Sequence, residues 1–211
     1  MKRDPPTNLP DWSRARGVLL IRLRSIGDTV LMTPCLAALK AWRPELEVAV
    51  VCERLAAPIL EDHPLVDRLL VADKSLAARV KLVAELRRAR YDVAFNLHGG
   101  TTATWLARLA GAGQTVGYEG YRHSRRLDLR APDPDVILGR ERLHSVEQQL
   151  ALLRWAGVPW PATRPQLSLA VSSDAERSVR EKLAAACRAQ AGGSRVSDEV
   201  AGGHFAVIAP A

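Results

Sequence analysis

The chain has 211 residues, of which 47% are hydrophobic and 25% charged, and its formal net charge is +7. Such a composition is typical of a globular protein with one core of ordinary domain size and a remainder. No apolar run approaches the ~20 residues that span a bilayer. The polar, proline-rich residues 1–16 also lack the apolar segment of a secretory signal. We therefore expect a cytoplasmic protein, either free or peripheral at the inner face of the membrane.

The positive charge favours an anionic partner, such as nucleic acid, a phosphorylated glycan or an anionic membrane surface. An arginine-rich solubilising surface explains the same charge, and both explanations stay open. The three cysteines, Cys35, Cys52 and Cys187, are odd in number and widely spaced. This pattern predicts buried thiols in a reducing compartment and no disulfide framework. The sequence contains no metal-ligand spacing, no GxGxxG, no P-loop and no GxSxG.

In chain order, residues 1–16 are expected to form a loose tail. Apolar runs and amphipathic segments then alternate, which is typical of a mostly parallel sheet with helices on both faces. Residues 118–142 break this pattern as a long polar connection. The expected strands cover residues 17–23, 46–52, 68–72, 92–97, 115–117 and 166–171. The expected helices cover residues 29–42, 53–62, 75–90, 101–110, 145–156 and 173–188.

Several of these helices carry signals for their ends and faces. Pro34 removes a hydrogen bond about one turn into the first helix, so this helix should kink or restart there. Capping boxes begin two later helices, at Ser145–Gln148 and at Ser173–Glu176. The helix over residues 75–90 has an apolar face that consists of Leu76, Val80, Val83 and Leu86.

The end of the chain predicts a domain boundary near Val171. A helix, a glycine- and serine-rich loop at 189–203 and a fresh apolar run at 204–211 follow that residue. We expect a Rossmann-like domain over residues 17–170. Residues 171–211 would then be a linker helix and the first strand of an incomplete second domain, and the fold class is α/β.

The turn after the first strand carries the strongest functional signal, Arg24-Ser-Ile-Gly-Asp28. In an open α/β sheet, ligands bind at the carboxyl ends of the strands, in the turns that lead into helices. Asp28 would cap the following helix, act as a general base, or do both. Gly27 leaves room for a ligand to approach the backbone.

The turn after the fourth strand, His98-Gly99-Gly100-Thr101-Thr102, lies at the same edge of the predicted sheet. Its glycines allow close approach of a ligand, and one of the two threonines would cap the next helix while it offers a hydroxyl group. The alternative is a simple glycine-rich connection between a strand and a helix.

Positive charge gathers in the long connection at Arg122, Arg125 and Arg126, and arginine binds carboxylates and phosphates bidentately. A solvated charge cluster is the alternative. His144 directly precedes a helix and would donate to an anion there, or else lie on the surface as an ordinary histidine.

Four segments, in this order, resemble the heptosyltransferases of lipopolysaccharide core assembly, glycosyltransferase family 9. The resemblance runs from about residue 17 to residue 211. The four segments are Arg24–Pro34, Tyr91–Gly99, Val116–Tyr118 and His144–Gly157.

The resemblance implies a GT-B fold, in which an N-terminal domain binds the sugar acceptor and a C-terminal domain binds a nucleotide sugar such as ADP-heptose. Transfer would invert the anomeric carbon without a metal or a cofactor, and Asp28 would be the general base. The acceptor would be an anionic lipopolysaccharide core such as Kdo-bearing lipid A, with no nucleic-acid partner. The residues expected to bind it are Ser25, Gly27, His98, Gly99, Thr101, Arg122, Arg125, Arg126 and His144.

Family members are about half as long again or more, so the resemblance places the donor-binding residues beyond residue 211. A chain of this length is therefore expected to be inactive alone. Two alternatives remain: a non-catalytic module that binds anionic glycolipid through Arg122, Arg125 and Arg126, and a decayed fragment without function.

Overall fold

The computed structural model of the protein describes residues 9–163 and 165–190. The chain divides into two units, one up to Ala170 and one from Val171 onward. In the second unit the described element is helix α7 (Ser173–Gln190). The predicted strand at 204–211, most of the predicted loop at 189–203 and the side chain of Cys187 lie outside the described residues.

The first unit contains one six-stranded sheet in which every pairing is parallel. Its strand order is β3-β2-β1-β4-β5-β6. On one side of β1 lie β2 and then β3, and on its other side lie β4, β5 and β6. The direction in which strands are added to the sheet therefore reverses between β1 and β4. In open α/β sheets this reversal opens a crevice at the carboxyl ends of the two central strands. The strands are β1 (Gly17–Ile21), β2 (Glu47–Glu53), β3 (Arg68–Ala72), β4 (Val93–Asn96), β5 (Gln114–Tyr118) and β6 (Leu129–Ala131).

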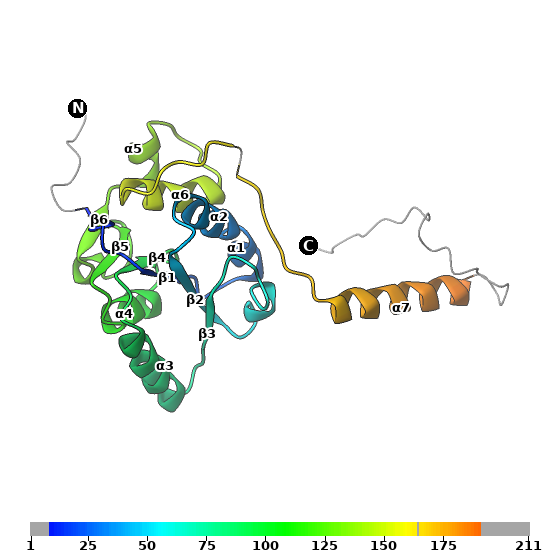
Figure 1. Cartoon of the computed structure of the whole chain (residues 1–211). Helices are drawn as coiled ribbons and strands as arrows, with labels where there is room; N and C mark the ends of the chain where they lie inside the picture. The colour runs from blue at the N-terminus through cyan, green and yellow to red at the C-terminus, as the bar shows by residue number, and fades with distance from the viewer. Residues whose placement is uncertain (1–8, 164, 191–211) are drawn as a thin grey trace. The chain divides into compact units, whose positions relative to one another are not determined.

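Helices cover both faces of the sheet, which confirms the α/β layering expected from the sequence (Figure 1). The side chains of successive residues of β1 point to opposite faces of the sheet. Val18 and Leu20 belong to the core under α2 and α6, whereas Leu19 and Ile21 belong to the core under α3 and α4. The main helices are α2 (Thr33–Trp42), α3 (Leu76–Ala89), α4 (Thr101–Leu109) and α6 (Ser145–Trp155).

The first predicted helix is two helices, α1 (Ile26–Val30) and α2, and the second begins at the turn that contains Pro34. The expected restart at this proline is therefore confirmed. The expectation that Asp28 is the N-cap is wrong, because Ser25 occupies that position and Asp28 is the third helical residue.

Three sequence-based predictions of elements were wrong. Residues 118–142 are not one polar connection, because they contain β6, the 3₁₀ turn η2 (Ser124–Arg126) and helix α5 (Pro134–Leu138). Residues 166–171 alternate apolar and polar residues but form no strand, since no neighbouring strand pairs with them. Of the helix expected at 53–62, only the 3₁₀ turn η1 (Ala57–Ile59) forms.

Part of the expected loose tail is packed against the domain. The Trp12 ring contacts Trp42 edge to face, with ring centroids 5.0 Å apart, and stacks on Phe95 at 6.3 Å. Its indole N–H donates to the carbonyl oxygen of Ala156 at 2.7 Å. These contacts tie residues near the N-terminus to the start of the segment that follows α6.

The caps of the last two helices lie one residue earlier than predicted. His144 is the N-cap of α6, and the Glu147 carboxylate accepts from its backbone N–H at 3.0 Å. At the start of α7, the Ser172 hydroxyl accepts from the N–H of Ala175 at 3.2 Å. No helix within the described ranges has the length and apolar character needed to cross a membrane.

Candidate active site at the switch point of the sheet

The candidate site lies where β1 and β4 end side by side. Ile21 and Asn96 are paired in the parallel ladder and are the last residues of their strands. The turn with Asp28 follows β1, and the turn with His98 follows β4. The reversal of strand order therefore brings together the two turns that carry the strongest sequence signals.

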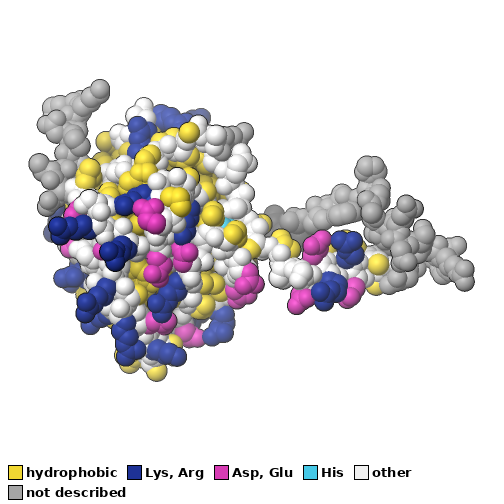
Figure 2. Space-filling view, viewed as in Figure 1, with side chains coloured by type: hydrophobic (Ala, Val, Ile, Leu, Met, Phe, Trp, Pro, Cys, Tyr) yellow, Lys and Arg dark blue, Asp and Glu magenta, His cyan; other side chains and the backbone are white. Residues whose placement is uncertain are grey.

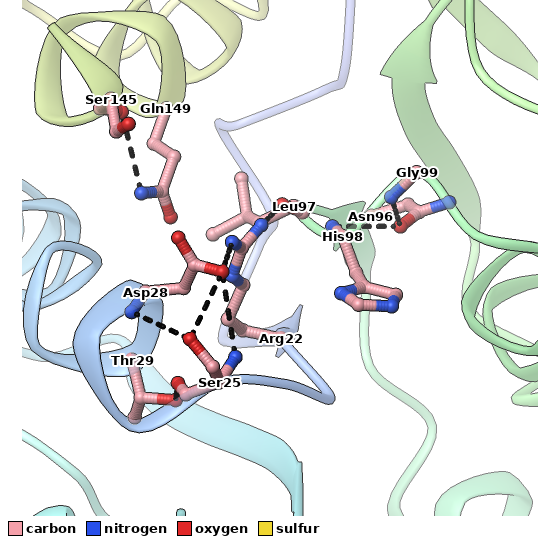
Figure 3. A network of polar contacts seen from close by, with 10 residues as sticks. All are labelled: Arg22, Ser25, Asp28, Thr29, Asn96, Leu97, His98, Gly99, Ser145 and Gln149. Atoms are coloured by element: carbon pink, nitrogen blue, oxygen red, sulfur yellow. Dashed lines mark hydrogen bonds and ion pairs between the residues drawn. The ribbon is translucent and has the colours of Figure 1, made fainter. Parts of the chain in front are cut away.

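Asp28 is held by contacts through one of its two carboxylate oxygens. Arg22 Nη2 forms an ion pair with Asp28 Oδ2 at 2.6 Å, and the backbone N–H and hydroxyl of Ser25 lie 3.4 Å from the same oxygen (Figure 3). The side chain of Asp28 is 39% exposed. Its Oδ1 atom makes no hydrogen bond or ion pair with any residue in the described ranges. Capping therefore uses Oδ2 and leaves Oδ1 free to bind a ligand.

Arg22 connects the two turns. Its side chain is only 13% exposed, and besides Asp28 it binds the carbonyl oxygen of Leu97 through Nη1. Nε of Arg22 is buried and has no hydrogen-bond partner within the described part of the chain. One guanidinium group thus links the helix after β1 to the turn after β4 and orients the Asp28 carboxylate.

The turn after β4 is built on Asn96. The side-chain oxygen of Asn96 accepts from the backbone N–H groups of His98 (3.1 Å) and Gly99 (3.0 Å), and its amide nitrogen donates to Thr104 Oγ1 at 3.1 Å. Gly99 has φ +77°, and a Cβ placed there would lie 2.7 Å from the Tyr121 ring. Glycine is required at this position both for its backbone conformation and for the lack of space.

His98 is half-buried, and Arg22 lies between it and Asp28 (Figure 3). Burial, together with the nearby charges of Arg22 and Arg24, holds the pKa of the His98 imidazole below its ordinary value. Its Nδ1 atom is buried and has no partner among the described residues. A neutral imidazole with a free ring nitrogen can hydrogen-bond a hydroxyl group in either direction.

A polar side chain from α6 completes the site. Gln149 is 5% exposed and extends toward the Asp28 carboxylate (Figure 3). Its amide nitrogen donates to the Ser145 carbonyl oxygen at 3.3 Å, and its Oε1 atom is buried without a partner in the described ranges. A buried, unsatisfied polar atom is costly, so this atom is suited to a hydroxyl group of a bound ligand.

The expected acceptor-binding residues are placed differently from one another. The backbone N–H of Arg122 donates to Gly99 O at 3.2 Å, so this arginine lies beside the His98 turn with an exposed side chain. The guanidinium of Arg126 instead lies over the Trp105 ring of α4, 4.1 Å from its centroid. Arg125 is exposed on η2. The structure therefore brings Arg122 to the site and directs Arg126 to the outer face of α4.

His144 and Thr101 differ from their expected local roles. Nδ1 of His144 accepts from the N–H of Val146 at 3.3 Å, so that atom is engaged in capping α6 and does not donate to an anion. Gly100 is the N-cap of α4, and neither threonine side chain caps the helix. At Gly27, a Cβ would meet nothing within 4 Å, so there is open space above this turn.

Arg22, Asn96 and Gln149 are the site residues that the sequence analysis missed. Arg22 had a visible signal, since it is a charged residue directly after an otherwise apolar strand. Asn96 gave a weaker one, as a buried polar residue at the end of β4. Gln149 gave none, because only the packing of α6 decides which of its polar residues faces the crevice.

The described residues contain no group of three or more His, Cys, Asp or Glu side chains that could hold a metal ion. The functional groups of the site are instead one carboxylate, one guanidinium, one imidazole and one amide. Such a set binds and orients hydroxyl groups and can accept a proton from one of them.

No family model matches the chain. A curated relative, lipopolysaccharide heptosyltransferase 1 of Campylobacter coli, is 24% identical over 95 residues, which cover 44% of this chain and 28% of that protein. The solved structure of E. coli ADP-heptose lipopolysaccharide heptosyltransferase II is 26% identical with a TM-score of 0.60, and covers 79% of this chain and 50% of that one.

A glycosyl transferase family 9 structure from Veillonella parvula has the same fold, with 19% identity and a TM-score of 0.67. It covers 91% of this chain and 52% of that one. The chain thus spans about half the length of the solved structures and 28% of the curated relative. These likenesses agree with the four motifs and with the strand order, and the chain is similar to lipopolysaccharide heptosyltransferases of glycosyltransferase family 9 over about half of the length of the solved structures.

Proposed function

We propose that this chain is the acceptor-binding part of an inverting heptosyltransferase, and that Asp28 is its general base. The observation that carries the proposal is the geometry of Asp28 at the switch point, where Oδ2 is fixed by Arg22 and Oδ1 is free. The ion pair with Arg22 orients the carboxylate, and the free Oδ1 atom is the one that can accept a proton from a bound hydroxyl group.

In this mechanism Asp28 Oδ1 accepts the proton of the attacking acceptor hydroxyl as that oxygen bonds to the anomeric carbon of the donor. The bond from that carbon to the diphosphate oxygen breaks at the same time, and the nucleoside diphosphate leaves with the electron pair. Arg22 keeps the carboxylate oriented through the Oδ2 contact. Gln149 Oε1 and the His98 ring bind neighbouring hydroxyl groups of the same sugar, which fixes the attacking group in position. The donor is a nucleotide sugar of the ADP-heptose type, in line with the E. coli relative.

The acceptor is an anionic lipopolysaccharide core, such as Kdo-bearing, phosphorylated lipid A. Arg122, whose backbone lies beside the His98 turn and whose side chain is exposed, supplies a cation for its acidic groups. We also propose that this part corresponds to the N-terminal domain of a GT-B enzyme and that donor binding requires the rest of the family's length, so the 211 residues alone do not transfer sugar. The position of Asp28 favours this enzyme over a module that only binds glycolipid, since binding needs no free carboxylate oxygen in the crevice.

The test is a fusion in which the chain is followed, after Pro210, by the part of E. coli heptosyltransferase II that it does not match. The fusion is assayed for heptose transfer from ADP-heptose to Kdo-bearing lipid A. Asp28→Asn keeps the size and the cap contacts of the side chain and should lower kcat by about 10²–10⁴-fold with little change in KM. Transfer at the unmodified rate by the Asp28→Asn fusion would disprove the base role.

A further inference from the structure

A second surface at the same edge of the sheet lies between α3 and α4. It is a groove of about 1330 Å³ whose floor includes Leu23, two residues after β1, and Leu82 of α3. Thr101 and Thr102, which follow the His98 turn, also line it. Most of its wall is apolar and comes from Leu76, Val80, Val83, Trp105, Leu106 and Leu109.

The apolar side chains of this groove are unusually exposed for a folded domain. Leu55, after β2, is 76% exposed, and Leu76 and Val80 of α3 are 78% and 62% exposed. The predicted apolar face of α3 is thus only partly used by the core, since Leu82 and Leu86 are the buried residues of that helix. Neighbouring exposed leucines cost free energy in water and mark a surface that contacts another apolar phase.

Positive charge surrounds the same groove. Its lining includes four cationic side chains and two acidic ones, and both acidic groups are already paired. Glu53 contacts Arg24 at 3.3 Å, and Asp73 contacts Arg54 at 3.3 Å. Over α3 and α4, Lys and Arg side chains lie among hydrophobic ones on the surface (Figure 2). The four cationic side chains are Arg54, Lys74, Arg79 and Arg87.

Protruding leucines, a half-exposed tryptophan and a basic rim are together the features of proteins that bind the interface of an anionic bilayer. We propose that the α3–α4 groove docks this protein on an anionic lipid surface, with Leu55 and Leu76 inserted among the acyl chains. Lys74 and its neighbouring arginines contact the lipid headgroups. Trp105 lies at the boundary between the two, with Arg126 stacked on its ring.

The charge of the rim is what favours a bilayer over a second copy of this chain. A second copy of this positively charged groove would repel the first, whereas anionic headgroups attract it. The groove also shares the carboxyl edge of the sheet with the Asp28 crevice, since residues after β1, β2, β3 and β4 line it. If the proposed function holds, the acceptor is anchored in a lipid surface. A protein docked on that surface through this groove would receive the acceptor at Asp28 directly from it.

The test is co-sedimentation of the 211-residue chain with vesicles that contain no lipopolysaccharide. Vesicles of phosphatidylcholine are compared with vesicles that include about 30% phosphatidylglycerol. We expect binding to the anionic vesicles that weakens as salt rises from about 0.1 M to about 0.5 M. The double variant L55S/L76S should lower the partition coefficient about 10- to 100-fold. Lys74→Gln should lower it about fivefold.

Matched controls come from surfaces outside the groove. Val136→Ser changes an exposed apolar residue of α5, and Arg130→Gln changes an exposed charge on β6, at the far edge of the sheet. Both should bind vesicles as the unmodified chain does. Equal binding to neutral and anionic vesicles, or equal losses in the control variants, would overturn the proposal. So would self-association of the chain that the L55S/L76S variant abolishes, because the occupant would then be a second copy.

The two proposals fail separately. Vesicle binding is measured without donor, acceptor sugar or the fused second part, so it does not depend on Asp28. Asp28→Asn should leave vesicle binding unchanged, and the L55S/L76S variant should leave the far-ultraviolet circular dichroism spectrum unchanged because both leucines are exposed.

Discussion

Two turns of this domain have nearly the same construction and differ in what they leave free. After β1, Ser25 caps a helix and Asp28 pairs with Arg22. After β3, Ser75 caps a helix and Asp73 pairs with Arg54. The two carboxylates are equally exposed, at 39% and 40%. Exposure therefore does not distinguish a candidate catalytic aspartate from a structural one.

The difference lies in the oxygens and in the neighbouring strand. At Asp73, Oδ1 accepts from Ser75 N at 3.1 Å and Oδ2 contacts Arg54, so both oxygens are engaged. The hydrogen bond from the Ser75 N–H holds the pKa of the Asp73 carboxyl below its ordinary value, and the hydrogen bond from Arg54 is the second cause. At Asp28 all side-chain contacts with the described residues use Oδ2, and β1 is next to β4 across the reversal of strand order. Local capping chemistry is thus similar, and the sheet topology decides which turn faces a crevice.

The largest expected contrast between the turns is in catalysis. In the fusion assay, Asp28→Asn should lower kcat about 10²–10⁴-fold, whereas Asp73→Asn should leave it unchanged. Asp73→Asn should instead lower the midpoint of urea unfolding slightly, because it weakens the support of the α3 cap. Initial rates and urea melts of both variants measure the two effects. Equal losses of rate would show that both carboxylates matter only for folding.

The sequence predicts most of the sheet because each central strand is an apolar run bounded by turn residues. Residues 68–72, for example, were predicted as a strand and form β3 with those bounds. The prediction was wrong where pairing is decided far away in the chain. Leu167, Leu169 and Val171 alternate as in a strand, yet all three are exposed and have no partner strand in the sheet.

The candidate site was predictable in part for the same reason. The turns with Asp28 and His98 carry local signals, namely glycines and polar residues that follow apolar strands. That these two turns are adjacent depends on the strand order, which no local pattern contains. Arg22 bridges them and Gln149 approaches from α6, so their roles depend on contacts over 70 residues of sequence or more.

A smaller contrast is expected between the two arginines. Arg22 is 13% exposed and binds both Asp28 and the Leu97 carbonyl oxygen, whereas Arg54 is 83% exposed. Arg22→Met leaves the Leu97 oxygen unsatisfied and should lower the free energy of unfolding by about 1–3 kcal/mol. Arg54→Met should cost about 0–1 kcal/mol, because water replaces an exposed ion pair.

Urea melts of both arginine variants measure these costs. Arg22→Lys keeps the charge but replaces the planar fork by a single ammonium group, so its stability should lie between those of the unmodified chain and Arg22→Met. A stability of Arg22→Met equal to that of the unmodified chain would show that Arg22 does not tie the two turns together.

The smallest effect on stability is expected at the second helical residue of each turn. That residue is Gly27 in α1 and Ala77 in α3. Because a Cβ at Gly27 meets nothing within 4 Å, Gly27→Ala should raise the free energy of unfolding by about 0.4–1 kcal/mol. Ala77→Gly should lower it by about 0.5–1 kcal/mol.

Alanine at position 27 would favour folding, so stability does not explain the glycine there. We infer that the glycine is needed for function. If the acceptor sugar lies over this turn, the methyl group of Gly27→Ala fills the space that the sugar needs. Titration of the chain with de-acylated, Kdo-bearing lipid A core should then show weaker binding by Gly27→Ala and unchanged binding by Ala77→Gly. A more stable Gly27→Ala variant that binds the sugar as well as the unmodified chain would place the acceptor away from α1.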